Sequence, residues 1–372
     1  VWLLLVNHAL PPVSEWAFHL DLWQFPFQLS GLCADNGQKV TPFSSEYFTL
    51  VKPFYQLLAD AGQKVITAYI KDGAFNKGQT MVKWHEAADG KWSFDYTGFD
   101  KFVAQMMSWG IGRQISCFSL VGWNTSIGYT DASGEARTLK LTVGSDEYRT
   151  VWNEFLDSFE RHLKTKGWFE KTVLYMDEIR EDEMRQVVSF IKQHNPDWKI
   201  GLAGSAVSSD VESAFYDYST ILGYDRTSTN AVATFYTSCA QSIHNAYVRL
   251  DNNPAEMVWV AWYAKAKGLN GFLRWAYDYW TNADPQDVRD GSNTAGDFSL
   301  IYRSDNSLSS VPLSSIRLEL LREGIQDYEK MRILSTNLMN PVVQKFTLTS
   351  GRFAGEIVTE AQGMLKKISA EY

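Results

Sequence analysis

The sequence of 372 residues predicts an α/β fold, namely a (β/α)8 TIM-type barrel with β-hairpin insertions. Eight segments are rich in β-formers, and they begin at residues 16, 64, 114, 172, 199, 218, 233 and 272. Most of these segments precede a helical pattern or a long excursion, which is the repetition typical of such barrels. Because the helix between the sixth and seventh segments is poorly defined, a doubly wound sheet is the alternative.

Two of the excursions have the pattern of β-hairpins, which would build up the rim of the barrel mouth. Residues 81–96 turn at Asp89-Gly90, and residues 126–141 turn near Ser133-Gly134. These hairpins follow the second and third strands. Apolar residues at helical spacing predict the helices at 44–64, 99–110, 145–167, 183–194, 254–270, 314–334 and 352–369.

The expected domain organisation has three parts. Residues 1–15 read as a remnant or linker from an upstream domain, since VWLLLV has the pattern of a strand and the first residue is not Met. Residues 16–335 form the predicted barrel, and residues 336–372 form a C-terminal helical extension that packs on it. No apolar run approaches the length that would span a membrane.

Composition disfavours some partners and favours others. The formal net charge is −8 without a long basic run, so nucleic acid and anionic membranes are disfavoured. Three separated cysteines and six histidines show no metal-ligand spacing, so neither a metal nor a cofactor is expected. Aromatic residues reach 14%, which suits a protein that binds the apolar faces of sugars, although a Trp-rich core is the alternative.

The strongest chemical signal is the acidic pair Asp177-Glu178, which ends the β-forming stretch at residues 173–176. At the carboxyl end of a barrel strand, side chains face the substrate. Two neighbouring carboxyls there can share one proton, so that one is an acid while the other is ionised. The alternative is a solvated pair that caps the helix predicted to follow.

Three stretches together resemble glycoside hydrolase family 123, the β-N-acetylgalactosaminidases. They are FHLDLWQFP (18–26), YMDEI (175–179), and GFLRWAYDYW (271–280) continuing to the predicted helix at 314–334. The resemblance extends from about Trp16 to Leu334. Members of that family have a (β/α)8 barrel preceded by a β-sandwich, which implies that an upstream sandwich is missing or trimmed here.

The resemblance implies an exo-acting, retaining hydrolase of terminal β-linked N-acetylgalactosamine on glycolipids or oligosaccharides. Adjacent residues have α-carbons about 3.8 Å apart, so two neighbouring carboxylates cannot easily flank a sugar. This favours substrate-assisted catalysis, in which the 2-acetamido carbonyl is the nucleophile. The resemblance implies Asp177 as the stabiliser of the oxazolinium ion and Glu178 as general acid/base. A glycan substrate favours a secreted, periplasmic or cell-surface location in a bacterium, and partner proteins stay unknown.

Several other side chains are candidate substrate contacts. Tyr175 is two residues before Asp177 and should share its face, and the rings of Trp275 and Tyr277 should project together beneath the sugar. Weaker candidates are Tyr236, Asn245, Arg274, Trp123, Asp21 and Trp23. The acidic residues Asp278, Asp284 and Asp287 are expected in a solvated loop. Two other functions stay open: a β-N-acetylglucosaminidase or broader hexosaminidase, and a non-catalytic glycan-binding barrel.

Overall fold

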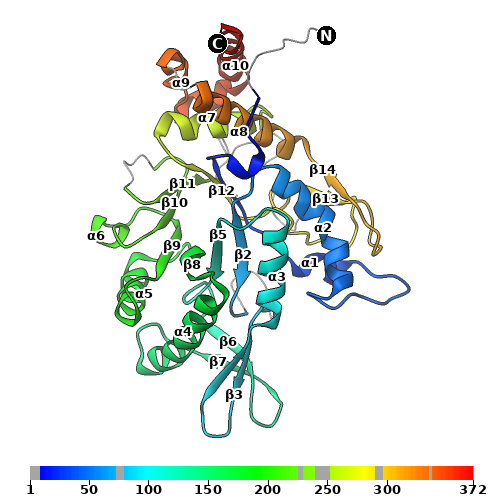
Figure 1. The fold of residues 1–372 in the computed structure, drawn as a ribbon, viewed down its shortest axis with the longest axis vertical. Helices are drawn as coiled ribbons and strands as arrows, with labels where there is room; N and C mark the ends of the chain where they lie inside the picture. Colours follow the sequence, from blue (N-terminus) through cyan, green and yellow to red (C-terminus); the bar gives the residue numbers. More distant parts are fainter. Residues whose placement is uncertain are drawn as a thin grey trace.

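The computed structural model describes residues 9–72, 79–224, 229–238, 252–289, 296–334 and 337–371. Eight parallel strands form one sheet in the order β1-β12-β11-β10-β9-β8-β5-β2, and the sheet curls into a nearly closed barrel (Figure 1). This confirms the predicted fold class. The strands are β1 (His19–Leu22), β2 (Val65–Tyr69), β5 (Gln114–Phe118), β8 (Thr172–Asp177), β9 (Lys199–Gly204), β10 (Asp217–Ile221), β11 (Val232–Tyr236) and β12 (Gly271–Arg274).

Two glutamine side chains complete the seam between β1 and β2, where the backbone ladder is short. The Lys64 N–H donates to the Leu20 carbonyl at 3.0 Å. Above this bond, the Leu22 N–H donates to Gln63 Oε1 at 2.9 Å, and the Thr67 N–H donates to Gln24 Oε1 at 2.9 Å. Because buried backbone groups need partners, these amides allow the barrel to close without a full β-ladder at this seam.

Helices surround the barrel in the order that the sequence predicts. Helix α4 shows why they form where they do: Ser145 caps its start, Gly167 ends it in the left-handed region with φ 71°, and its apolar face is buried. The helices are α1 (Phe27–Leu32), α2 (Ser45–Asp60), α3 (Thr97–Ser108), α4 (Asp146–Lys166), α5 (Glu181–His194), α6 (Ser209–Glu212), α7 (Glu256–Lys267), α8 (Ile316–Leu334), α9 (Asn340–Val343) and α10 (Ala354–Glu371).

The connection between β10 and β11 differs from the regular pattern. The described residues between these strands contain no helix, which agrees with the poorly defined sequence pattern there. Short helix α6 links β9 to β10, and the sequence pattern did not predict it.

Both predicted hairpins are present, and together they form a second sheet. Strands β3 (Lys83–Glu86) and β4 (Trp92–Asp95) make one hairpin, and β6 (Ser126–Thr130) and β7 (Ala136–Lys140) make the other. A parallel bridge between His85 and Thr130 joins them in the order β4-β3-β6-β7. The ring of Trp84 stacks on Phe155 of α4 with centroids 4.6 Å apart. This sheet lies at the lower end of the molecule in Figure 1.

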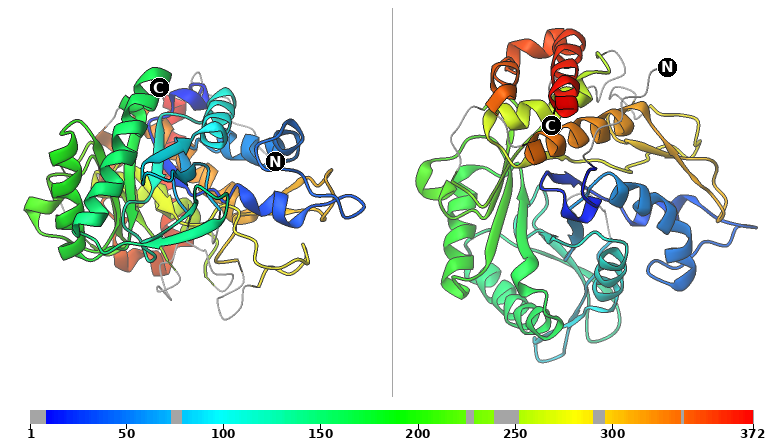
Figure 2. Two further views of the ribbon diagram at one scale, coloured as in Figure 1. Left: turned by 90° about the horizontal axis from the view of Figure 1, so that it is seen from below. Right: turned by 45° about the horizontal axis from the view of Figure 1, so that its top comes forward.

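The C-terminal helices lie at the other end. Figure 2 shows α9 and α10 beyond α7 and α8, away from the hairpin sheet. Helix α7 is apolar on nearly all sides because it lies between the barrel and these helices; Trp262 stacks on Phe346 at 5.2 Å. A two-stranded ribbon, β13 (Ile301–Arg303) with β14 (Pro312–Ser314), precedes α8. Six tryptophans are fully buried, so much of the aromatic content belongs to the core.

Candidate active site

Asp177 and Glu178 lie where β8 ends. Asp177 is the last residue of the strand and pairs in register with Ala203 of β9. The Glu178 N–H donates to the Ala203 carbonyl at 2.7 Å, and Glu178 has φ +50°, in the left-handed region that side chains other than glycine rarely adopt. The chain therefore turns sharply at Glu178. As a result the Asp177 side chain is half-buried, whereas Glu178 is exposed.

The two carboxyls have different electrostatic environments. Burial, followed by the nearby charge of Glu178, raises the pKa of Asp177 well above its ordinary value. The protonated form of Asp177 is therefore favoured in the free protein.

Tyr236, at the end of β11, reaches the pair from across the barrel mouth. Its hydroxyl donates a hydrogen bond of 3.0 Å to Glu178 Oε1, and its ring is buried. Burial and the charge of Glu178 raise the pKa of Tyr236, so the phenol remains a donor. The structure thus brings together Tyr236 and Glu178, two of the residues singled out in the sequence.

Besides Tyr236 and Tyr277, four of the predicted contact residues are buried inside the protein. Tyr175, Trp23 and Asp21 are at most 1% exposed. The Tyr175 ring packs on Phe118 at 5.3 Å and its hydroxyl points to Asp217, the first residue of β10. Asp21 accepts a bond from Trp23 Nε1 at 3.3 Å. These side chains fill the barrel beneath the pair, so we correct their assignment from sugar contacts to supports of the site.

Arg274 is the fourth such residue. It is completely buried, forms an ion pair with Asp297, and donates to the carbonyls of Thr237 and Asp297. Thr237 directly follows β11, and Asp297 lies beyond β12, so the guanidinium joins two loops at the mouth. Its predicted role as a direct sugar contact is therefore corrected to that of a bridge between loops.

Trp275 and Tyr277 do not share a face, because β12 already ends at Arg274. Tyr277 is fully buried and its hydroxyl donates to the Phe54 carbonyl in α2 at 2.8 Å, so the prediction of a sugar-stacking ring is wrong for Tyr277. Trp275 is half-buried, and its ring contacts Phe298 edge-on with centroids 4.7 Å apart. Its role as a platform stays a prediction. Asn245 lies outside the described residues.

Asp278 was expected in a solvated loop, and this expectation is wrong. The side chain is 1% exposed. It accepts bonds from the Phe25 N–H at 2.7 Å and from the Tyr55 hydroxyl at 3.1 Å. Burial raises the pKa of Asp278 to about 7. The carboxyl therefore ties the end of β1 to α2.

Trp123 lies on the loop after β5, and 69% of its surface is exposed. Strand β5 is the neighbour of β8, with Phe118 paired to Tyr175, so this loop leaves the barrel beside the acidic pair. Buried Lys71 fixes the loop: its Nζ donates to the carbonyls of Asn124 at 2.8 Å and Ser126 at 3.0 Å. This role of Lys71 could not be predicted from the sequence, because its partners are backbone carbonyls.

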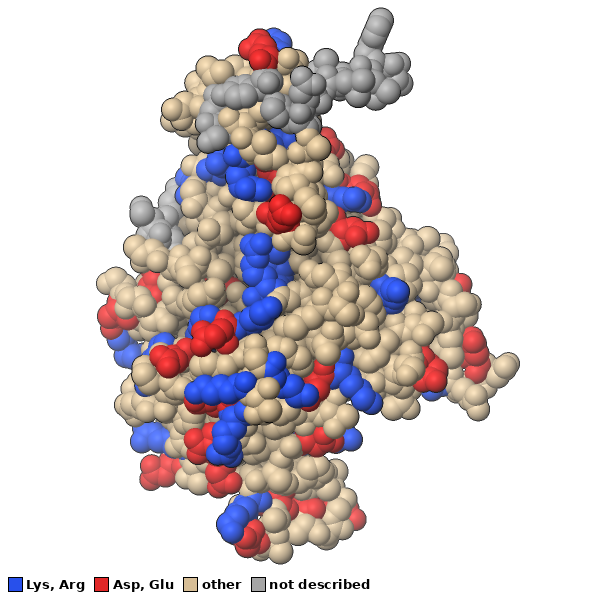
Figure 3. All heavy atoms as spheres, in the orientation of Figure 1, with Lys and Arg blue, Asp and Glu red and all other residues tan. Residues whose placement is uncertain are grey.

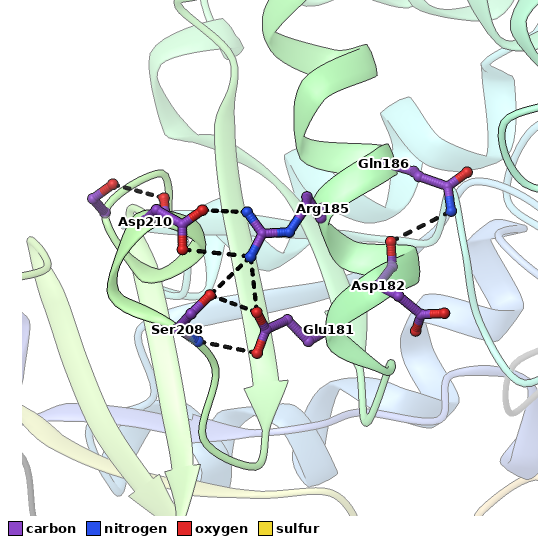
Figure 4. A network of polar contacts seen from close by, with 7 residues as sticks. Glu181, Asp182, Arg185, Gln186, Ser208 and Asp210 are labelled. Atoms are coloured by element: carbon purple, nitrogen blue, oxygen red, sulfur yellow. Dashed lines mark hydrogen bonds and ion pairs between the residues drawn. The ribbon is translucent and has the colours of Figure 1, made fainter.

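The segment directly after the pair is also held in place. Figure 4 shows Arg185 of α5 between Glu181 and Asp210, with Ser208 bonded to Glu181. The Ser208 N–H donates to Glu181 at 3.1 Å. These contacts join the start of α5 to the loop after β9, which fixes the turn at Glu178 from both sides. Individually, such exposed pairs contribute little stability, so their main effect is geometric.

Neither a metal site nor a membrane-spanning helix is found among the described residues. No group of His, Cys, Asp or Glu side chains there converges in a way that could hold a metal ion. Within the same residues, no helix has both the length and the apolar character needed to cross a bilayer.

Comparisons with known proteins agree with the fold. The family description "Glycoside hydrolase 123, catalytic domain" matches residues 29–334. A family 123 glycoside hydrolase from Clostridium perfringens, whose structure was analysed for the details of glycolipid glycan hydrolysis, has a TM-score of 0.87 at 24% identity. The match covers 98% of this chain and 72% of that chain. No curated protein sequence matches the chain.

Other glycoside hydrolases of known structure are much less similar, with TM-scores below 0.5. The catalytic domain of a family 30 xylanase from Talaromyces cellulolyticus has a TM-score of 0.42 at 11% identity, covering 84% of this chain and 76% of its own. A maltogenic α-amylase from Thermotoga neapolitana has a TM-score of 0.44 at 11% identity, with coverages of 86% and 77%.

Proposed function

Since the chain belongs to glycoside hydrolase family 123, we propose that it is an exo-acting, retaining enzyme that releases terminal β-linked N-acetylgalactosamine through an oxazoline intermediate. The observation that carries this proposal is the adjacent pair Asp177-Glu178 at the carboxyl end of β8. The study of glycolipid glycan hydrolysis by the Clostridium perfringens enzyme supports glycolipid or oligosaccharide substrates. Such substrates favour a secreted, periplasmic or cell-surface location.

The adjacency of the two carboxyls favours the substrate's own nucleophile. Retaining enzymes with a carboxylate nucleophile place two carboxyls about 5–5.5 Å apart on either side of the bond. Neighbours on one strand end occupy one side, so the acetamido carbonyl oxygen is the better nucleophile. It attacks C1 while Glu178 gives its proton to the leaving oxygen. Glu178 then takes a proton from the water that attacks C1 and opens the oxazoline.

The position of the shared proton fits these roles. In the free protein, burial favours the proton on Asp177. A bound acetamido N–H donates to Asp177 and stabilises its anion, so the proton of the pair moves to Glu178, beside the leaving oxygen. The Tyr236 hydroxyl already donates to Oε1 of Glu178, which leaves Oε2 to carry that proton.

Trp123 is in a position to contact the aglycone, the part of the substrate beyond the scissile bond. A flat apolar ring held on a fixed loop beside the pair offers a stacking surface for a sugar or lipid aglycone. Such a contact would affect extended substrates far more than small ones.

The first test is hydrolysis of 4-nitrophenyl β-N-acetylgalactosaminide and β-N-acetylglucosaminide, with the β-galactoside as control. We expect no release from the β-galactoside, since the acetamido group supplies the nucleophile, and release from the β-N-acetylgalactosaminide alone if the site also recognises the axial C4 hydroxyl. Release from both acetamido sugars would indicate a broad hexosaminidase. A thiazoline mimic of the intermediate should inhibit strongly. No hydrolysis of any of the three substrates would favour the non-catalytic glycan-binding barrel.

A further inference from the structure

A cavity lies at the amino-terminal ends of the barrel strands, at the opposite end of the barrel from the acidic pair. It has a volume of about 230 Å³ and is lined by Ser14, Gln63, Lys64, Met107, Gly110, Gly112, Arg113 and Lys171. No carboxylate is among these residues. Since a water occupies about 30 Å³ in the liquid, the cavity has room for a small ion with several waters.

Three cations reach this cavity from equivalent positions in the fold. Lys64 directly precedes β2, Arg113 directly precedes β5, and Lys171 directly precedes β8. These three strands are consecutive in the sheet, so their starts lie side by side. Figure 3 shows a run of basic side chains in the middle of the face on which Figure 1 labels β2 and β5.

The side chains of these cations donate hydrogen bonds to backbone carbonyl oxygens. Lys64 Nζ donates to Val13 at 3.1 Å, Arg113 Nη2 to Trp16 at 3.4 Å, and Lys171 Nζ to Gly112 at 3.2 Å. Within the described part of the chain, none of the three forms an ion pair. Three cations without an ion-pair partner among the described residues meet here although the protein carries a net charge of −8.

Lys64 shows the electrostatic cost of this arrangement. The residue is only 5% exposed. Burial and the charge of Arg113 lower the pKa of Lys64 to about 8, while Glu329 of α8 acts in the opposite direction. His19 of β1 is close to the same cations. Burial and the charges of Arg113 and Lys64 lower the pKa of His19 to about 3, so it is neutral. An anion in the cavity would offset the repulsion between the cations.

We propose that this cavity binds a doubly charged oxyanion of the phosphate or sulfate class. Arg113 supplies a planar fork that matches two oxygens of such an ion, and Lys64 and Lys171 supply ammonium groups on either side. The site lies at the opposite end of the barrel from Asp177 and does not depend on the glycosidase proposal. Bound anion would stabilise the folded state, because it binds the assembled strand ends and not the unfolded chain.

Titration calorimetry with inorganic phosphate, at constant ionic strength, tests the site. The Arg113→Ala/Lys171→Ala variant removes two exposed cations, and it should weaken binding by about tenfold or more, since each charge-assisted bond contributes to affinity. The matched control is Lys83→Ala/Lys91→Ala, which removes two exposed cations from the hairpin sheet. Equal loss in both variants, or no binding by the parent, would overturn the proposal.

Proton uptake supplies a second readout. At pH 8.5 a bound dianion should raise the pKa of Lys64, so the parent takes up protons as phosphate binds. This uptake appears as a dependence of the observed heat on the ionisation enthalpy of the buffer. In Lys64→Met the phosphate should bind more weakly and without uptake. Uptake that persists unchanged in Lys64→Met would assign the titrating group elsewhere and overturn the role of this lysine.

Discussion

The Tyr236 hydroxyl and Oε1 of Glu178 are joined by a hydrogen bond of 3.0 Å that connects β11 to the turn after β8. The bond holds one oxygen of Glu178 and leaves its second oxygen open to the substrate. Tyr236 is therefore placed to orient the proposed general acid without taking part in proton transfer itself.

Replacement of Tyr236 by Phe should lower kcat/KM for a glycan substrate, because Oε1 of Glu178 loses its donor and the carboxyl is held less firmly beside the leaving oxygen. Loss of a hydrogen bond costs about 0.5–1.5 kcal/mol, so we expect a fall of about two- to tenfold. The control is Tyr148→Phe, which removes a buried hydroxyl bonded to the Leu120 carbonyl. An unchanged kcat/KM in Tyr236→Phe would show that this bond does not orient the acid.

Glu178→Gln should remove the general acid and should act most strongly on substrates with poor leaving groups. We expect turnover of a glycan to fall by about 10²- to 10⁴-fold, and that of the 4-nitrophenyl glycoside far less, because nitrophenolate leaves without a proton. Asp177→Asn should impair both substrates alike, since stabilisation of the oxazolinium ion does not depend on the leaving group. A loss of the same size on both substrates in Glu178→Gln would argue against its acid role.

Trp123→Ala should lower kcat/KM for β-N-acetylgalactosamine-terminated oligosaccharides by about tenfold, since loss of an aromatic contact costs about 1 kcal/mol or more. The methyl glycoside, which has no extended aglycone, should be affected little. Phe353→Ala is a suitable control, because Phe353 is 57% exposed on the C-terminal extension. An equal loss on the methyl glycoside would place Trp123 outside the proposed aglycone contact.

The sequence pattern predicted the barrel well because its signals are local. Each of the eight strands has a run of β-forming residues, and helices such as α4 have local start and stop signals at Ser145 and Gly167. The location of Asp177-Glu178 at a strand end could be predicted for the same reason. The pattern overestimated the length of several strands, including β12, which ends at Arg274, and this placed Tyr277 on the wrong face.

The partners of buried polar side chains could not be predicted, because they lie far away in the sequence. Asp278 depends on Phe25 and Tyr55, and Arg274 depends on Asp297 across the loop after β12. Both residues are charged, and a charged residue near a strand end has the same pattern whether it faces solvent or a buried partner. Burial of these groups follows only from the closure of the barrel, which brings β1 beside β12.

Asp278 makes the stability of the folded state depend on pH. The sign of this dependence is opposite to that of an ordinary salt-bridged carboxylate. Its pKa is about 7 in the folded protein and near 3.8 in the unfolded chain. Between these values the folded protein binds more protons than the unfolded chain, so the contribution of Asp278 to stability falls as pH rises. The contribution is complete below about pH 4 and is lost as pH passes through about 7.

Asp278→Asn should therefore remove this contribution to the pH dependence of the unfolding free energy. The amide is neutral at every pH, and its oxygen can still accept the bond from the Phe25 N–H. We expect the unfolding free energy of the parent to fall relative to that of the variant between pH 5 and 8, by an amount on the order of a few kcal/mol. Urea denaturation of both proteins across this range measures the difference, and effects of the other titrating groups cancel in it. Parallel curves for the two proteins would mean that Asp278 is ionised throughout, with Tyr55 and the Phe25 N–H sufficient to stabilise its charge in the core.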